Sequence, residues 1–315
     1  MTISFRRLGS FGAVSLSVLL ASCSGSPAVP GASGTSTAGA IPPQLGPTQS
    51  LLKRLGALDA VPPKKLGPGR IYVSYYGGFA GGGVLTFTPK GKQRSPTITE
   101  SNTVQLIAVD ANGKIYVTLF GDEKIQTYLP DGTQTKPTIN LGFNPDGVTV
   151  DRAGKIYVTD VFNNRLMTYN AHGSQTTPTI TGLDYPQGVA VGSSGKIYIA
   201  NSQGNQVDTY TAAGVQTTPT INVNGPGGVA VDANGKIYVT DSPDSTVFTY
   251  RPDGTPTSPT ITTGLSSPYG ITVDANGQIY VANAGGNNVT TYSKKGTQLK
   301  VTIACCENPR GVAVH

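Results

Sequence analysis

The stretch Gly154-Lys155-Ile156-Tyr157-Val158-Thr159 decides the fold, because close copies of it return about every 40 residues along the chain. A second aromatic residue follows each copy at a nearly constant distance. The tyrosines of the six copies are Tyr72, Tyr116, Tyr157, Tyr198, Tyr238 and Tyr280, and the following aromatics are Phe87, Tyr128, Tyr169, Tyr210, Tyr250 and Tyr292. A fixed period of this length with strand-like pieces inside it predicts the blades of a β-propeller.

One repeat, read from Pro145 to Ile180, contains four short apolar pieces rich in Val, Ile, Thr and Tyr. Gly, Asp or Asn bounds each piece, which is typical of strands joined by hairpin turns. Four antiparallel strands make one blade. The expected first strands are residues 106–110, 147–151, 188–192, 228–232, 270–274 and 311–315.

The two ends of the repeat region complement each other. It opens at Gly69-Arg70 with a second strand that lacks a first strand, and it ends with an unpartnered first strand at 311–315. Pairing these two pieces would complete blade one and remove the unpaired edges of an open array. The sequence therefore predicts an all-β, six-bladed propeller of 24 strands, closed by its C-terminal strand. A closed ring offers no free sheet edge, so we expect a monomer.

Proline marks the outermost strand of most repeats, because proline cannot donate to a sheet ladder and belongs on an edge. The residues at this place are Pro96, Pro137, Pro178, Pro219 and Pro259, with Lys300 taken as the residue of the sixth copy.

The first 66 residues indicate export. Arg6 and Arg7 precede an apolar run at 11–20, which is too short to span a bilayer. The run ends in Leu-Ala-Ser-Cys23, which resembles a bacterial lipobox and predicts a signal peptide at 1–22 with Cys23 lipidated; an ordinary cleavable signal is the alternative. A Gly/Ser/Pro-rich tether follows at 23–66, and the propeller occupies 67–315. We therefore expect a membrane-anchored lipoprotein facing the periplasm or the cell exterior.

The charge balance narrows the possible partners. A formal charge of +6 is mild for 315 residues and gives no argument for nucleic acid. Lys and Arg at the starts of the second strands form a basic ring on the face opposite the channel mouth. Because aspartates share the same turns, we expect solvated turn charges rather than a membrane-docking surface. The basic ring is Arg70, Lys114, Lys155, Lys196 and Lys236, and the aspartates are Asp110, Asp151, Asp232 and Asp274.

The pattern Pro-x-Gly-Val-Ala-Val-Asp-x-x-Gly-x-Ile-Tyr-Val-x-Asp-x-x-Asn-Asn-Arg resembles the NHL repeat, within the wider group of six-bladed TolB-like propellers. The resemblance covers Gly69 to His315. Relatives of this kind include lactonases of the gluconolactonase type, streptogramin lyases, amidating lyases and many binding modules without enzymatic activity. The resemblance implies the fold and does not select one of these functions.

The expected mouth of the central channel is the end where the chain enters the first strands. Two sets of residues occupy equivalent places around it but differ from repeat to repeat. Functional sites of repeat proteins are usually found at such variable positions. The residues before the first strands are Gln105, Asp146, Gln187, Gly227, Tyr269 and Arg310. The residues at the ends of the second strands are Asp160, Asn201, Asp241 and Asn283. The first set predicts either a ligand or partner site or a plain solvated rim. The second set favours hydrogen bonds to the backbone of its own loops.

Catalysis finds little support among these residues. Lactonases that resemble this fold hold a divalent cation with oxygen ligands, whereas this ring offers one acid, Asp146, opposed by Arg310. Lyases of the group depend on histidines, and His172 and His315 are expected on the opposite face, two blades apart. We therefore predict no catalytic residue, metal or cofactor, with calcium as a less favoured possibility. The leading hypothesis is a module that binds a protein, peptide or glycan at the mouth, and the alternative is a metal-dependent lactonase.

Two adjacent cysteines, Cys305 and Cys306, lie in the loop before the closing strand. Adjacent Cα atoms are about 3.8 Å apart across a trans peptide, which is below the usual range for a disulfide. A vicinal disulfide would therefore be strained and readily reduced, and two free thiols are the alternative.

Overall fold

A computed structural model describes residues 69–77 and 81–315. The predicted signal peptide 1–22, the lipidation site Cys23 and the tether 23–66 lie outside the described residues.

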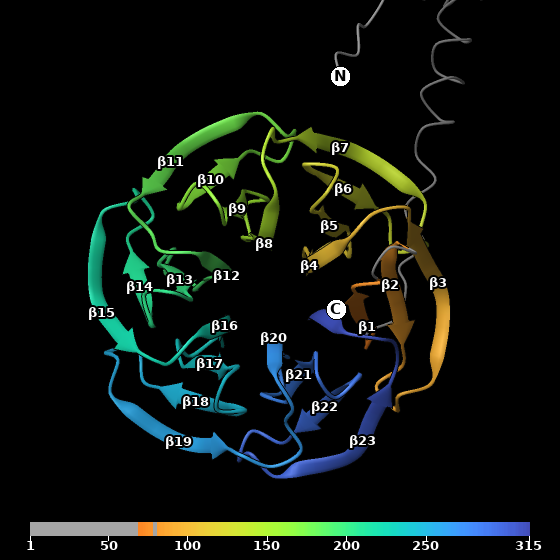
Figure 1. Cartoon of the computed structure of the whole chain (residues 1–315), viewed down its shortest axis with the longest axis vertical. Coiled ribbons are helices and arrows are strands. Elements are labelled where there is room, and N and C mark those ends of the chain that lie inside the picture. The colour runs from red at the N-terminus through yellow and green to blue at the C-terminus, as the bar shows by residue number, and fades with distance from the viewer. Residues whose placement is uncertain (1–68, 78–80) are drawn as a thin grey trace, which may run out of the picture. The chain divides into compact units, whose positions relative to one another are not determined.

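The described residues form six four-stranded antiparallel sheets arranged as blades in a ring (Figure 1). Blades 1 to 3 are β24 (Pro309–Val314), β1 (Ile71–Tyr75), β2 (Gly82–Phe87) and β3 (Gln93–Glu100); β4 (Val104–Val109), β5 (Ile115–Leu119), β6 (Lys124–Tyr128) and β7 (Gln134–Asn140); and β8 (Pro145–Val150), β9 (Ile156–Asp160), β10 (Arg165–Tyr169) and β11 (Gln175–Thr181). Blades 4 to 6 are β12 (Pro186–Val191), β13 (Ile197–Asn201), β14 (Gln206–Tyr210) and β15 (Gln216–Asn222); β16 (Pro226–Val231), β17 (Ile237–Asp241), β18 (Thr246–Tyr250) and β19 (Pro256–Ile261); and β20 (Pro268–Val273), β21 (Ile279–Asn283), β22 (Asn288–Tyr292) and β23 (Gln298–Ala304).

The predicted closure of the ring is confirmed. β24 pairs with β1 in antiparallel register, with Ile71 opposite Val314 and Val73 opposite Val312. The ladder continues at its end, where the backbone N–H groups of Gly69 and Arg70 donate to the carbonyl of His315 at 2.9 and 3.0 Å. Both ends of the described propeller therefore belong to blade 1. The first strands begin at Pro or Val about two residues before the predicted starts.

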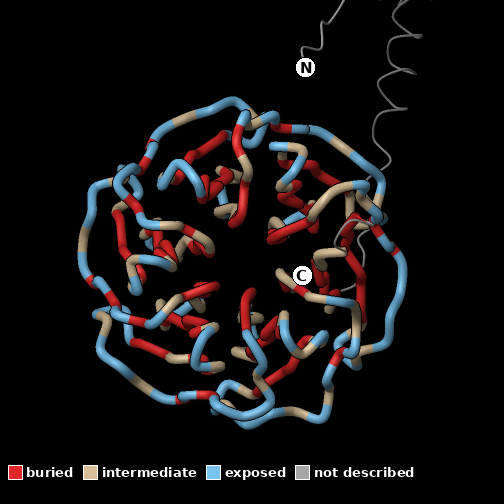
Figure 2. Tube along the Cα trace, in the orientation of Figure 1, coloured by how far each residue is buried: buried red, intermediate tan, exposed pale blue. Residues whose placement is uncertain are grey.

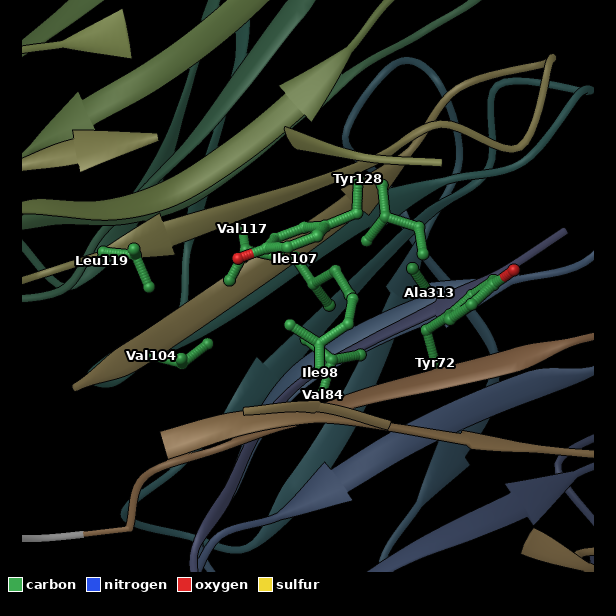
Figure 3. Close-up of a cluster of buried hydrophobic side chains, with 10 residues drawn as sticks. Tyr72, Val84, Ile98, Val104, Ile107, Val117, Leu119, Tyr128 and Ala313 are labelled. Carbon is green, nitrogen blue, oxygen red and sulfur yellow. The ribbon is translucent and has the colours of Figure 1, made fainter. Parts of the chain in front are cut away.

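The core lies between neighbouring blades. In the cluster shown in Figure 3, Tyr72 and Val84 of blade 1 pack with Ile107 and Tyr128 of blade 2, and Tyr72 is fully buried. Figure 2 shows the result for the whole ring, with buried inner strands and exposed outer strands. Because each blade buries its faces only against its neighbours, the ring must close for every blade to be covered.

The outer strands are joined by contacts between a turn and a proline. A Cβ on Gly132, in the β6–β7 turn of blade 2, would lie 2.5 Å from Cβ of Pro96 on β3 of blade 1, so only glycine fits this approach. The same contact recurs around the ring. In blade 6 the residue at the proline position is Val301, which lies 3.2 Å from a Cβ built on Gly91. Taking Lys300 for this position was wrong by one residue.

The basic ring has a structural role that the sequence did not reveal. Lys114 Nζ donates to the carbonyl of Lys136 at 3.0 Å, and Lys196 Nζ donates to Thr218 at 2.9 Å. Arg70 reaches the carbonyl of Pro130 at 2.9 Å. The two lysine bonds satisfy outer-strand carbonyls and the Arg70 bond satisfies a carbonyl of the β6–β7 turn, so these side chains brace the blades and are not merely solvated turn charges.

Candidate functional site

Two faces of the propeller are named here. The mouth face carries the loops that lead into the first strands and those that join the second strand to the third. The base face carries the turns that join the first strand to the second and the third to the fourth.

Buried hydroxyl groups position the residues of the mouth face. In blade 5, Thr240 Oγ1 accepts the N–H of Gly228 at 2.7 Å and donates to the carbonyl of Tyr269, in blade 6, at 2.8 Å. Equivalent hydroxyls donate to the carbonyls of other mouth residues: Ser74 to Gln105, Thr118 to Asp146 and Thr159 to Gln187. Each hydroxyl therefore links one blade to the backbone of the next at the mouth.

The substitution Thr240→Val tests this link. Valine keeps the shape of threonine but leaves the buried carbonyl of Tyr269 and the N–H of Gly228 without this partner. We expect the free energy of unfolding to fall by about 1–3 kcal/mol in urea titrations. Thr220→Val is the matched control, because Thr220 is exposed on β15. An equal loss in both variants would contradict the role given to Thr240.

Tyr269 reaches across the channel to the opposite side of the ring. It lies on β20 of blade 6, and its hydroxyl donates to Asp146 on β8 of blade 3, at 2.8 Å to Oδ2 and 3.1 Å to Oδ1. The ring of Tyr269 passes Gly227 of the neighbouring blade, where a Cβ would lie 3.4 Å from Tyr269 Cδ2, at ordinary van der Waals contact. Tyr269 and Asp146 together bridge the channel below the mouth.

Burial governs the ionisation of this pair. It raises the pKa of Asp146 to about 6, although the hydrogen bond from Tyr269 and the charge of Arg310 both oppose the rise. Burial and the neighbouring Asp146 carboxylate raise the pKa of Tyr269 well above its usual range. Tyr269 is therefore a hydrogen-bond donor at neutral pH, and Asp146 titrates near neutrality.

Arg310 is held between aromatic rings. Its guanidinium lies 4.8 Å from the ring centroid of Tyr269 and 5.8 Å from that of Tyr76. Within the part of the chain that the structure describes, Arg310 forms no salt bridge, and its buried Nε has no hydrogen-bond partner. The buried Oε1 of Gln105 is likewise unpartnered among these residues. Arg310 is thus a rigid cation that is able to receive an anionic or acceptor group.

A pocket of about 610 Å³ opens beside Arg310 on the mouth face. It contains three of the six predicted ring residues, namely Gln187, Tyr269 and Arg310, whereas Asp146 lies beneath Tyr269 and is 4 % exposed. Small polar residues dominate the remaining wall: Ser202, Ser242, Ser267, Asn287 and Asn308, with Glu307. The pocket therefore offers many hydrogen-bonding groups around one cation.

Aromatic side chains from three successive blades extend the mouth face. Phe162 is 60 % exposed and packs edge-on against Phe120 and Tyr185, with ring centroids 5.8 and 6.2 Å apart. Tyr185 has a φ of 54°, a left-handed conformation that is unusual for a bulky residue. We call Phe120, Phe162 and Tyr185 the aromatic arc. Phe162 is exposed and the other two rings are half-buried; aromatic side chains are enriched at contact surfaces.

The residues at the ends of the second strands are buried and bonded within their own loops. Asp160 accepts Arg165 Nε at 2.7 Å, and Asp241 accepts the backbone N–H of Asp244 at 2.9 Å. Asn283 donates to Asn288 Oδ1 at 2.9 Å, and Asn201 donates to Asp208. These side chains therefore connect the ends of the second strands to the residues that follow them in the same blades.

Cys305 and Cys306 lie half-buried in the mouth loop between β23 and β24. No disulfide joins them in this structure, and their Sγ atoms are 3.0 Å apart. The S–H of Cys306 donates to Cys305 and lowers the pKa of that thiol. The vicinal disulfide stays a prediction, which mass spectrometry of the unreduced protein can check.

The two histidines lie on the base face. His172 is exposed in the β10–β11 turn, and His315 follows β24 with Nε2 3.3 Å from the carbonyl of Ala111. No group of three or more His, Cys, Asp or Glu placed to hold a metal occurs among residues 69–77 and 81–315. The same residues include no helix with the length and apolarity needed to cross a bilayer.

A second cavity, of about 740 Å³, opens on the base face between the turns of blades 3 to 6. Its aspartates are already engaged: Asp232 accepts the N–H groups of Asn234 and Lys236 and the hydroxyl of Tyr238. We therefore place the candidate site at the mouth.

Fold and site together define a six-bladed β-propeller with a bridged channel and a polar, aromatic mouth. Residues 75–315 match the virginiamycin B lyase family, and the chain belongs to that family.

Solved structures of low identity share the fold. A chain in the nidogen/laminin complex is 17 % identical with a TM-score of 0.66, over 78 % of this chain and 98 % of that one. A streptogramin B lyase is 18 % identical with a TM-score of 0.57, over 79 % and 88 %. A catalytically inactive virginiamycin B lyase from Staphylococcus aureus with quinupristin, whose inactivating change replaces histidine with alanine, is 20 % identical with a TM-score of 0.52, over 63 % and 70 %. A search of curated proteins found no match.

Proposed function

We propose that the propeller is a binding module that engages a protein, peptide or glycan through its mouth face. The observation that carries this proposal is the unpaired Arg310, fixed between Tyr76 and Tyr269 at the wall of the pocket. A cation held in this way gives a directional contact for a carboxylate or carbonyl. The aromatic arc supplies apolar contact area at little entropic cost. A propeller chain from a protein complex, the nidogen/laminin complex, shares the fold.

The placement of the histidines supports binding over lyase chemistry. The structurally similar Staphylococcus lyase is inactive when a histidine is replaced with alanine. In this chain the described mouth residues include no histidine, because His172 and His315 lie on the base face. General acid–base catalysis requires a group within hydrogen-bond reach of the reacting proton.

The mouth also fits poorly as a divalent cation site of the lactonase type. Both carboxylate oxygens of Asp146 accept the Tyr269 hydroxyl, and the positive charge of Arg310 lies close by. Calcium prefers six to eight oxygen ligands, several of them charged. No catalytic step through a metal is therefore proposed.

We also propose that Cys23 carries a lipid that keeps the exported propeller at the membrane surface. The lipobox-like Leu-Ala-Ser-Cys23 motivates this. Fatty-acid labelling of the wild type that persists unchanged in Cys23→Ser would contradict it.

Site-specific crosslinking in the producing cell tests the binding function. A photoreactive phenylalanine replaces Phe162, which is 60 % exposed on the mouth face, or Val215, which is 64 % exposed on the base face. We expect discrete adducts from position 162 and none from position 215. Adding Arg310→Ala to the first variant should reduce the adducts at least several-fold.

Two results would contradict the proposal. The first is the same set of adducts from both positions, which would indicate random collision. The second is consumption of quinupristin by the purified protein, which would show lyase chemistry at a site without mouth histidines.

A further inference from the structure

Two turns on the base face hold far more positive charge than their counterparts. They join the third and fourth strands of blades 1 and 6, which are neighbours at the closure of the ring. Their basic residues are all exposed, and none forms a salt bridge among the described residues. We call this set the basic seam: Lys90, Lys92, Arg94, Lys294, Lys295 and Lys300.

The same turns in the other four blades carry little net charge. Blade 2 has one basic and one acidic residue there, Lys136 and Asp131, and so has blade 5, with Arg251 and Asp253. Blades 3 and 4 have no Lys, Arg, Asp or Glu there. The basic seam contains no acidic residue. The positive charge is therefore a property of two adjacent blades and not of the repeat.

The turn of blade 1 packs on the outer strand of blade 6. A Cβ on Gly91, between Lys90 and Lys92, would lie 3.2 Å from Val301 Cγ1 and 3.6 Å from Ile303 Cγ1 on β23. The turn of blade 1 thus rests on the outer strand that carries Lys300 and begins just after Lys294 and Lys295.

The mouth face has the opposite charge. Its basic residues are Lys124, Arg165 and Arg310, and its acids are Glu100, Asp122, Glu123, Asp146, Asp160, Asp184, Asp241, Asp244 and Glu307. A propeller polarised in this way turns its base toward an anionic surface and its mouth away from it.

The N-terminal part of the chain also joins the propeller beside the basic seam. Gly69 bonds to His315 on the base face, and a Cβ on Gly69 would lie 2.7 Å from Cγ of Pro89, next to Lys90. The first described residue of the propeller therefore lies on the base face, next to the turn that carries Lys90 and Lys92.

We propose that the basic seam docks the propeller onto the anionic headgroups of a phospholipid membrane, with the mouth face directed away from the lipid. The charge complementarity and the position of Gly69 carry this inference, which does not depend on the function proposed for the mouth. Each basic residue near an anionic membrane strengthens binding about five-fold, so removing three should weaken it about 100-fold.

Vesicle co-sedimentation tests the proposal with residues 23–315 carrying Cys23→Ser, so that no lipid is attached. The vesicles contain phosphatidylcholine with or without about one third phosphatidylglycerol. We expect binding to the anionic vesicles only, with a steep loss as salt rises. The variant Lys92→Gln/Lys294→Gln/Lys295→Gln should bind about 100-fold more weakly. The control Lys136→Gln/Arg152→Gln/Arg251→Gln removes equal charge from the base face outside the seam and should lose at most a few-fold.

Equal losses in the two triple variants would overturn the proposal, as would no binding of the unsubstituted protein. Dextran sulfate serves as a polyanion without a membrane: seam-dependent binding to it with none to vesicles would also overturn a lipid partner. Acetylation footprinting on vesicles reports orientation. We expect protection of Lys90, Lys294 and Lys295 and continued reaction of Lys124 on the mouth face; protection of Lys124 instead would contradict the docked orientation.

Discussion

Deleting residues 309–315 is expected to abolish the cooperative unfolding transition of the propeller. The deletion removes β24, which pairs with β1 along its length, and exposes Ile71 and Val73, which are fully buried. It also opens the core between blade 1 and both of its neighbours. We expect a loss of more than about 5 kcal/mol, comparable with the total stability of many domains. Circular dichroism during heating would show a broad transition or none.

A point substitution in β24 tests whether this strand closes the ring without shortening the chain. Val312 is 5 % exposed on β24, and Val312→Asp places an unpaired carboxylate between blades. We expect it to lower the free energy of unfolding by roughly 3 kcal/mol or more. Val215→Asp introduces the same charge at a position that is 64 % exposed and should have little effect. If the deletion and Val312→Asp both unfold like the wild type, β24 does not hold the ring closed.

The fold was predictable from the sequence because the same strand pattern recurs in six copies. The position of each tyrosine fixes a second strand, and the unpartnered strand at the C-terminus fixes both the blade number and the closure. The starts of the strands and the alignment of the sixth repeat were predicted less accurately. Pro145 and its equivalents begin the first strands, because a proline is tolerated at a strand start. The outer strands of the other five blades can be aligned by their shared proline. The sixth outer strand has no proline, so the sequence alignment placed Lys300 where the structure has Val301.

The candidate site was only partly predictable. The repeat places Asp146 and Tyr269 at equivalent positions, but no periodicity reveals that one side chain crosses the channel to the other. That contact needs the length of the tyrosine side chain. The aromatic arc lies in loops that vary between repeats, so its residues do not recur at the repeat spacing and the sequence pattern does not reveal them. The basic seam is visible in the aligned turns of blades 1 and 6, but the mild net charge of the whole chain does not reveal it.

The buried carboxyl of Asp146 should make stability fall as pH rises. Its pKa is about 6 in the folded protein, against 3.8 for the free group. A group whose pKa rises on folding stabilises the fold fully below its unfolded pKa, and this stabilisation is lost as pH rises through the folded pKa. A shift of about two units corresponds to about 3 kcal/mol, lost between about pH 4 and pH 7. We therefore expect Asp146→Asn to be more stable than the wild type at pH 8 by about that amount and to show no such gain at pH 4.

Urea denaturation at pH 4, 6 and 8 measures this difference. The amide introduced by Asp146→Asn keeps an oxygen that accepts the Tyr269 hydroxyl, so the bridge remains while the buried charge is removed. Asp184→Asn on the exposed mouth rim is the control and should show no comparable gain. Tyr269→Phe should steepen the loss with pH, because the hydrogen bond from Tyr269 lowers the pKa of Asp146. Parallel pH profiles for the wild type and Asp146→Asn would show that Asp146 ionises freely, and the bridge across the channel would then have to be abandoned.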